Sequence, residues 1–137
     1  MKLPPIEHIG IAVKDAEAVA QFYTSLLGLE RIETEVVESM KLKIIKLRSQ
    51  NVTIELLEPQ AGEEVVANFI QKRGEGLHHL CFETDDVEQA SEELQQKGYK
   101  PLWDKPRPGS GHRLVQFLHP VQTYGVLIEL NQKPKKS

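Results

Sequence analysis

Residues 6–29, IEHIGIAVKDAEAVAQFYTSLLGL, set the pattern for the whole chain, because residues 77–99, LHHLCFETDDVEQASEELQQKGY, repeat it. Each stretch opens with a histidine in an apolar segment and continues into a helical pattern. Farther on, VTIELLEP (52–59) and GVLIELNQ (125–132) each carry one glutamate in an apolar segment. An internal duplication shows which residues are equivalent in space, so His8 and Glu55 correspond to His79 and Glu129.

Hydrophobic periodicity predicts the same elements in both halves. In the first half, alternation from residue 6 to 13 predicts a strand, and Asp15 and Gly28 mark the start and end of an amphipathic helix. Three further strands are expected near 31–36, 42–47 and 52–57. The second half predicts a strand over 77–84, a helix that stops at Gly98, and strands near 100–103, 114–118 and 125–130. Each half is therefore a βαβββ module, and the fold class is α+β.

The modules are expected to form one domain of 137 residues. Module 1 covers about 6–59 and module 2 about 76–131, with a helical linker at about 60–75 and a flexible tail at 132–137. The linker places Val66, Phe69 and Ile70 on one apolar stripe. This stripe and the short edge strands suggest a homodimer.

Composition excludes several classes of protein. A net charge of −3 argues against a nucleic-acid binder, because neutralising phosphates needs clustered Lys and Arg. No apolar run reaches the roughly 20 residues that span a bilayer, so no membrane association and a cytoplasmic location are expected. Cys81 is the single cysteine and is interpreted as a small buried residue. A phosphate-bearing small molecule could still use Lys105, Arg107 or Arg113.

The two His and Glu couples predict a metal site. Strand alternation turns Glu55 and Glu129 away from the faces that pack on helices, and the same parity separates His79 from His78. His78 is therefore interpreted as structural or as a support for the ligands. Two His and two carboxylates suit a borderline divalent ion with room for exchangeable ligands.

Motifs in order along the chain carry a family resemblance: HIGIAVKD, FYTSLLGL, IELLEP, KRGEGLHHLCFETDD, the PRPG loop, FLHP and GVLIEL. With them the chain resembles the vicinal oxygen chelate, or glyoxalase-like, superfamily, and within it the methylmalonyl-CoA epimerases. The resemblance implies paired modules in a U-shaped mixed sheet around a metal-binding cleft. It implies an acyl-CoA substrate and a cobalt, zinc, manganese or nickel ion. The implied ligands are His8, Glu55, His79 and Glu129.

The resemblance also implies catalytic roles. Epimerisation removes a proton between a thioester and a carboxylate through a metal-stabilised enolate, and returns one on the opposite face. Glu129 takes the role of one acid/base group. The second, a Glu in some relatives, aligns with Lys43, which could serve if burial and the metal lower its pKa. His119 in FLHP is a further polar candidate, with a turn role as the alternative.

Three other functions remain as alternatives. A glyoxalase I-like lyase acting on a thiol hemithioacetal uses a similar metal and the same enolate chemistry. A metal-free binding or resistance protein of the same fold would have lost ligands, which the intact quartet disfavours. An iron-dependent ring-cleaving dioxygenase needs two His and one carboxylate, so the fourth ligand from Glu55 disfavours it.

Overall fold

The computed structural model describes residues 3–134, which form two compact units. One unit consists of residues 8–78, and the other of the described residues before 8 and after 78. The boundaries fall inside β1 (Ile6–Ala12) and β5 (Gly76–Glu83), so each of these strands contributes to both units. Across residues 3–134, no helix has the length and apolar character needed to cross a bilayer.

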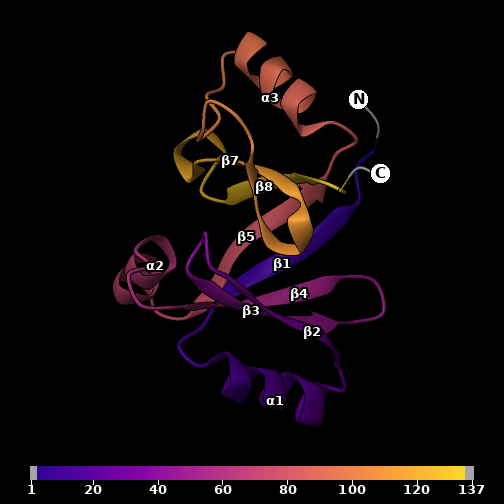
Figure 1. Ribbon diagram of the computed structural model, residues 1–137, viewed down its shortest axis with the longest axis vertical. Helices are drawn as coiled ribbons and strands as arrows, with labels where there is room; N and C mark the ends of the chain where they lie inside the picture. The colour runs from indigo at the N-terminus through magenta and orange to yellow at the C-terminus, as the bar shows by residue number, and fades with distance from the viewer. Residues whose placement is uncertain (1–2, 135–137) are drawn as a thin grey trace. The chain divides into compact units, whose positions relative to one another are not determined.

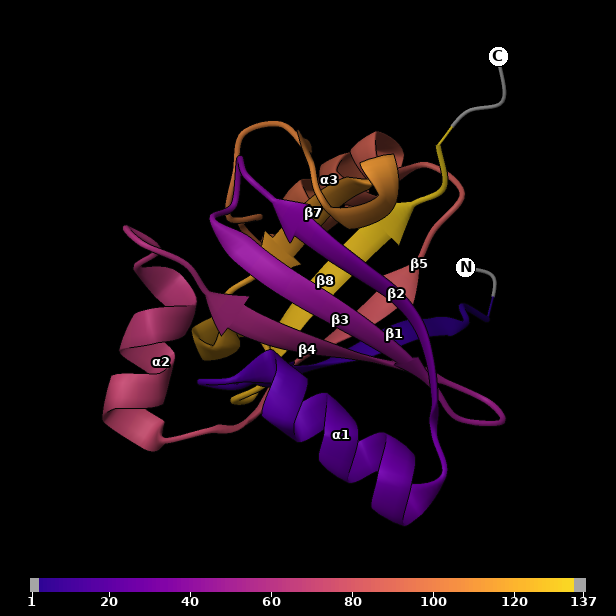
Figure 2. The same cartoon turned by 60° about the horizontal axis from the view of Figure 1, so that its bottom comes forward.

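Unit 8–78 contains module 1 and the linker. Its elements after β1 are α1 (Ala16–Leu27), β2 (Glu30–Val37), β3 (Leu42–Arg48), β4 (Thr53–Pro59) and α2 (Val65–Arg73). The strands lie in the order β2-β3-β4-β1, with β1 parallel to β4 and the other neighbours antiparallel. Figures 1 and 2 show α1 lying along one face of this sheet. The βαβββ order predicted for module 1 is confirmed.

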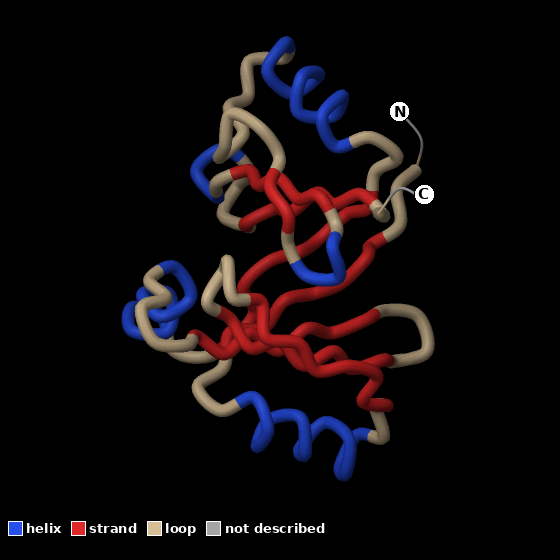
Figure 3. Tube along the Cα trace, viewed as in Figure 1, coloured by secondary structure: helices blue, strands red, loops and turns tan. Residues whose placement is uncertain are grey.

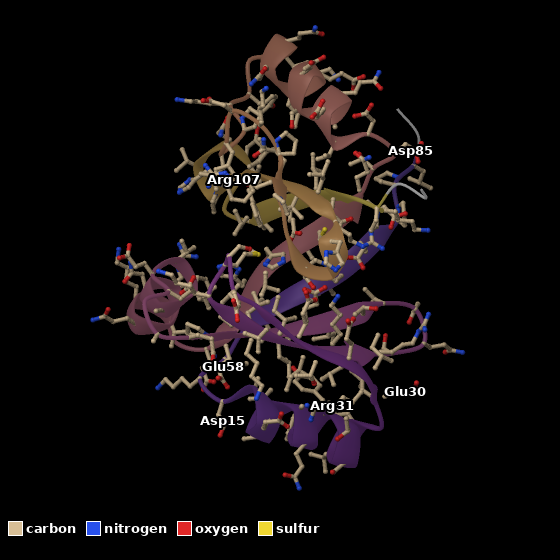
Figure 4. All side chains as sticks on the ribbon, in the orientation of Figure 1. Asp15, Glu30, Arg31, Glu58, Asp85 and Arg107 are labelled. Carbon is tan, nitrogen blue, oxygen red and sulfur yellow. The ribbon has the colours of Figure 1, made fainter. Side chains whose placement is uncertain are left out.

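Local capping residues and one side chain from the sheet define the ends of α1. The Asp15 side chain accepts a hydrogen bond from the Ala18 amide, as expected of an N-cap, and Glu58 of β4 accepts from the Ala16 amide at 2.8 Å. Figure 4 shows Asp15 and Glu58 near the start of this helix. Gly28 ends it with φ of 78°, a left-handed conformation that glycine adopts without a steric cost.

Both faces of the module 1 sheet are apolar, and strand alternation separates them. On the α1 face the buried core consists of Ala16, Ala20, Ile45, Leu47, Leu56 and Val13. On the other face, Leu42, Ile44 and Leu57 pack with Val66 of α2, and Phe69 and Ile70 are partly buried against them. The linker stripe therefore packs on the core of its own unit. It does not supply the exposed apolar surface on which the homodimer prediction partly relied.

The second unit contains module 2. After β5 it comprises α3 (Val87–Gln96), β6 (Arg107–Pro108), the 3-10 turn η1 (Ser110–His112), β7 (Leu114–Leu118), the 3-10 turn η2 (Pro120–Gln122) and β8 (Leu127–Gln132). These strands run in the order β5-β8-β7-β6, with β5 parallel to β8. Figure 3 distinguishes the strands of this unit, in red, from the tan loops that join them. Asp86 caps α3 by accepting from the Gln89 amide. The unit repeats the βαβββ order of module 1.

One predicted strand, near 100–103, is wrong. That segment is a loop, and the edge strand β6 lies farther along as two residues, Arg107–Pro108. Pro101 and Pro106 flank the loop and have no amide hydrogen to donate to a sheet ladder. Leu102 makes a single backbone bond to the Phe117 carbonyl, at 2.8 Å.

Two glutamine side chains replace the missing ladder. Gln116 is fully buried; it accepts from the Trp103 amide at 3.1 Å and donates to the Trp103 carbonyl at 2.9 Å. Gln122 bonds Lys100 in the same way, at 2.7 and 2.8 Å, in an exposed setting. The loop is thus anchored through side chains rather than through strand pairing.

Replacing Gln116 by Leu should lower the free energy of unfolding by about 1–3 kcal/mol, because it leaves backbone groups of Trp103 and Phe117 without their partner. Gln122→Leu is the matched control, and it should cost less than about 1 kcal/mol because water can replace its bonds. Urea denaturation measures both. An equal loss in the free energy of unfolding for both variants would show that the burial of Gln116 does not increase the contribution of its hydrogen bonds to stability.

Candidate active site

The first His and Glu couple sits on two neighbouring parallel strands of unit 8–78. His8 on β1 and Glu55 on β4 are brought together by the register, in which Gly10 lies beside Glu55. The His8 Nδ1 atom is 3.2 Å from the Glu55 Oε2 atom, and the two residues are 3% and 4% exposed. Gly10 and Ala12 share the face of His8, so small side chains surround the imidazole.

The second couple repeats this geometry in the other unit. His79 on β5 lies 2.9 Å from Glu129 on β8, measured from Nε2 to Oε1, and each residue is 7% exposed. The register places Cys81 beside Glu129. In both couples the glutamate therefore pairs with the residue two positions after the histidine. The equivalence inferred from the repeated sequence also holds in the strand register.

Both couples have the spacing of metal ligands. Two atoms bonded to one metal at about 2.1 Å and set at a right angle lie about 3 Å apart. The measured separations of 3.2 and 2.9 Å match this value. Removing a carboxylate from water costs several kcal/mol unless an opposite charge or hydrogen bonds compensate, and an imidazole and a divalent cation both do so. The donor set of each couple, one nitrogen and one oxygen, fits a borderline divalent ion.

An aromatic wall borders the second couple. Phe117 on β7 is the cross-strand partner of Glu129, so its ring lies on the same face of the sheet. The ring stands edge-to-face to His79, with centroids 6.1 Å apart, and to Trp103, at 5.4 Å. No sequence motif predicted this aromatic wall. Alternation counted from Leu118 would have placed Phe117 on the polar face, whereas Trp103 lies on a loop without periodicity.

Lys43, the second predicted acid/base group, lies on the side of the module 1 sheet that α1 covers. In β3 it pairs with Glu58, and its Nζ atom is 3.3 Å from the Glu17 Oε1 atom on α1. It therefore lies on the helix-covered face, opposite to Glu55. Lys46, three residues on, is the cross-strand partner of Glu55 and shares its face. The family resemblance pointed to strand β3, and strand alternation places the Lys43 side chain on the α1 face of that strand.

Lys43 belongs to an ion-pair cluster with Glu17 and Arg31. Arg31 donates two hydrogen bonds to the Glu17 carboxylate, at 2.7 and 2.9 Å. These bonds, and the smaller effect of Lys43, lower the pKa of Glu17 from 4.5 to about 2. In turn, Glu17 raises the pKa of Arg31. Figure 4 marks Arg31 near α1 in this unit. The cluster ties α1 to β2 and β3 on the outside of the sheet.

The remaining polar candidates have structural contacts. His78 packs edge-to-face on Phe69 of α2, with centroids 4.9 Å apart. His119 caps η2, because its Nδ1 atom accepts a hydrogen bond from the Val121 amide at 3.2 Å. This is the turn role that was the alternative for His119. Cys81 is fully buried, as the sequence predicted.

The two arginines suggested for a phosphate have different surroundings. Arg113 donates from Nη1 to Glu83 at 3.0 Å and to Asn131 at 3.2 Å, and Asn131 in turn donates to Glu7 at 2.8 Å. Arg113 is thus part of an internal polar network. Arg107 instead lies over the Trp103 ring, with its guanidinium carbon 4.6 Å from the centroid.

Comparison with known proteins gives one family. The model of the Glyoxalase/Bleomycin resistance protein/Dioxygenase superfamily matches residues 7–117. Methylmalonyl-CoA epimerase of Mus musculus mitochondria is 33% identical over 132 residues, which are 96% of this chain and 74% of that protein. Ethylmalonyl-CoA/methylmalonyl-CoA epimerase of Cereibacter sphaeroides is 34% identical, over 93% of this chain and 96% of that protein.

A solved structure gives the same result. A variant of Streptomyces coelicolor methylmalonyl-CoA epimerase in complex with 2-nitronate-propionyl-CoA has a TM-score of 0.90 and 36% identity. The match covers 98% of this chain and all of the other, 100%. The α+β fold class and the family resemblance expected from the sequence are confirmed.

Replacing Glu55 by Ala should weaken binding of Zn²⁺ or Co²⁺ by at least about 10-fold. Loss of a residue that only hydrogen-bonds to a metal ligand already lowers metal affinity by about 10–100-fold. The control is Glu58→Ala on the same strand, which faces α1 and should leave affinity unchanged. Competition with a chelating dye measures both. An unchanged affinity in Glu55→Ala would exclude Glu55 as a ligand.

Proposed function

Since this chain belongs to the Glyoxalase/Bleomycin resistance protein/Dioxygenase superfamily, we propose that it is a metal-dependent epimerase of methylmalonyl-CoA. The recurrence of one buried His and Glu couple at the same register in both modules carries the proposal. Relatives that bear the name methylmalonyl-CoA epimerase match nearly the whole chain at about one third identity. Because both couples are intact, the metal-free binding function is disfavoured.

The proposed metal ligands are His8 and Glu55 in one unit, and His79 and Glu129 in the other. Their mixed nitrogen and oxygen donors suit cobalt, zinc, manganese or nickel. When bound, such an ion supplies a Lewis acid that polarises the thioester carbonyl and makes the neighbouring C–H more acidic. The support is the spacing within each couple and the burial of all four residues.

Glu129 is the proposed acid/base group for one face of the substrate. Its carboxylate is 7% exposed and lies beside Phe117, so water competes little for it. It takes the proton from the carbon between the thioester and the carboxylate and returns it when the reaction reverses. Inversion needs a second proton carrier on the other face of the planar intermediate. Because Lys43 lies on the α1 face and pairs with Glu17, we propose that another group has that role.

Glu129→Gln should keep much of the metal affinity, because an amide oxygen still coordinates, and should lose about 10²- to 10⁴-fold in turnover, because an amide cannot take the proton. Deuterium exchange at the substrate α-carbon and metal analysis measure the two properties separately. Turnover close to wild type would exclude Glu129 as the base.

Two control variants test whether the loss of turnover is specific to Glu129. Glu55→Gln should be mild, because the position supplies only an oxygen ligand. Lys43→Met should keep epimerisation within about threefold of wild type, since a true proton carrier contributes far more. A larger loss in Lys43→Met, with the fold intact, would restore Lys43 as a catalytic candidate.

We also propose a homodimer, on grounds other than the linker stripe. Phe22 and Leu26 of α1 and Val36 of β2 are large apolar residues that are more than half exposed, and β2 ends the sheet of its unit. An edge strand beside exposed apolar side chains is a common association surface. Light scattering at micromolar concentration should give twice the chain mass of 15.5 kDa. A monomer mass would overturn this proposal.

The proposed location is the cytoplasm. Cys81 is the single cysteine of the sequence, so the fold uses no intrachain disulfide and suits a compartment in which thiols stay reduced. Cell fractionation with an antibody against the chain tests this location.

A further inference from the structure

A row of charged side chains crosses the module 1 sheet beside the first His and Glu couple. Lys46 on β3 is the cross-strand partner of Glu33 on β2 and, on its other side, of Glu55 on β4. Gly10 of β1 lies next to Glu55 at the end of the row. Figure 2 shows β2, β3 and β4 side by side. Cross-strand partners share a face of the sheet, so an ammonium group lies between two carboxylates on the face opposite to α1.

The surroundings of Lys46 are unusual for a lysine. Its side chain is 14% exposed, and its Nζ atom lies 3.4 Å from the Glu33 Oε2 atom. The Glu33 side chain is 51% exposed, so water screens this ion pair and the pair contributes little to stability. A lysine ammonium has three donors on a flexible stem. Lys46 can therefore exchange its solvated partner for an anion that arrives on the same face.

The other lysine of the same strand has a different setting. Lys43 lies on the α1 face, 3.3 Å from Glu17, in the cluster that Arg31 completes with two hydrogen bonds to that carboxylate. This cluster ties the helix to the sheet. Lys46, three positions later, has the same side chain on the face of Glu55. The two lysines form a matched pair, with the same charge on opposite faces of β3.

We propose that Lys46 is a specificity-determining residue that binds the free carboxylate of the acyl group, next to the His8 and Glu55 couple. The inference rests on the proposed function, in which a metal ion at these ligands binds a malonyl-type thioester. Such a substrate differs from a simple acyl-CoA by a carboxylate on the reacting carbon. Glu55 repels that carboxylate, and the ammonium group on the neighbouring strand offsets the repulsion.

Two thioesters that cannot be epimerised test this role. Malonyl-CoA has the free carboxylate but no stereocentre, and acetyl-CoA lacks the carboxylate. Calorimetry with Co²⁺-loaded protein gives the ratio of their affinities, in which contacts to the shared part of the ligands cancel. Lys46→Met should weaken malonyl-CoA binding about 10-fold or more and leave acetyl-CoA binding unchanged, because a charge-assisted bond to the carboxylate is lost. An unchanged ratio would overturn the proposal.

A second variant separates carboxylate binding from a structural role of the ion pair. Glu33→Gln removes the carboxylate that competes for Lys46, so malonyl-CoA should bind about twofold more tightly or better. If the pair were only structural, Glu33→Gln and Lys46→Met would act in the same direction. Weaker malonyl-CoA binding in both variants would therefore overturn the proposal.

The matched lysine controls for a general effect of charge. Lys43→Met removes one positive charge from the α1 face and should leave the affinity ratio within about twofold of wild type, since Lys43 pairs with Glu17. Lys46→Arg keeps the charge on the Glu55 face and should retain most of the preference for malonyl-CoA. An equal loss of that preference in Lys43→Met and Lys46→Met would show that the residue on the Glu55 face has no special role.

The outcome also separates this role of Lys46 from the proposed function. If wild-type protein epimerises methylmalonyl-CoA and Lys46→Met leaves the affinity ratio unchanged, the role of Lys46 is wrong and the proposed function stands. If malonyl-CoA is preferred through Lys46 but no epimerisation occurs, the role of Lys46 stands and the proposed function is wrong.

Discussion

The structure depends on the burial of one imidazole and one carboxylate side by side on neighbouring parallel strands. Neither group is stable alone in an apolar sheet, because an unpaired buried charge costs several kcal/mol. In each unit the register brings the two atoms to about 3 Å and provides the missing partner. The same spacing suits two donor atoms of one metal ion, so the arrangement that stabilises the fold also fits the proposed metal site.

The two faces of the module 1 sheet carry different side chains. In module 1, Ile45, Leu47 and Leu56 pack on α1, while Glu55 points the other way. Because successive side chains of a strand point to opposite faces, two neighbouring positions on one strand face opposite sides of the sheet. Lys43 shows the consequence. It lies on β3, next to the strand that carries Glu55, and yet its ammonium group pairs with Glu17 of α1.

The loop between α3 and β6 shows how an irregular segment can be held as firmly as a strand. Gln116 and Gln122 each bond both backbone groups of one loop residue, as a neighbouring strand would. This anchoring keeps Trp103 against Phe117 and gives Arg107 a fixed ring to stack on. A polar side chain in the core therefore positions an aromatic wall beside the site.

The sequence by itself determined the two βαβββ modules, the capped helices and the equivalence of His8 with His79 and of Glu55 with Glu129. These features follow from local periodicity, capping and repetition. Only the tertiary structure decided which face Lys43 occupies, that residues 100–103 are a loop, and that the linker stripe packs on its own core. It also placed Trp103 against Phe117 and Arg107 over the Trp103 ring. Such contacts depend on strand register and on side chains far apart in the chain, and no local pattern encodes them.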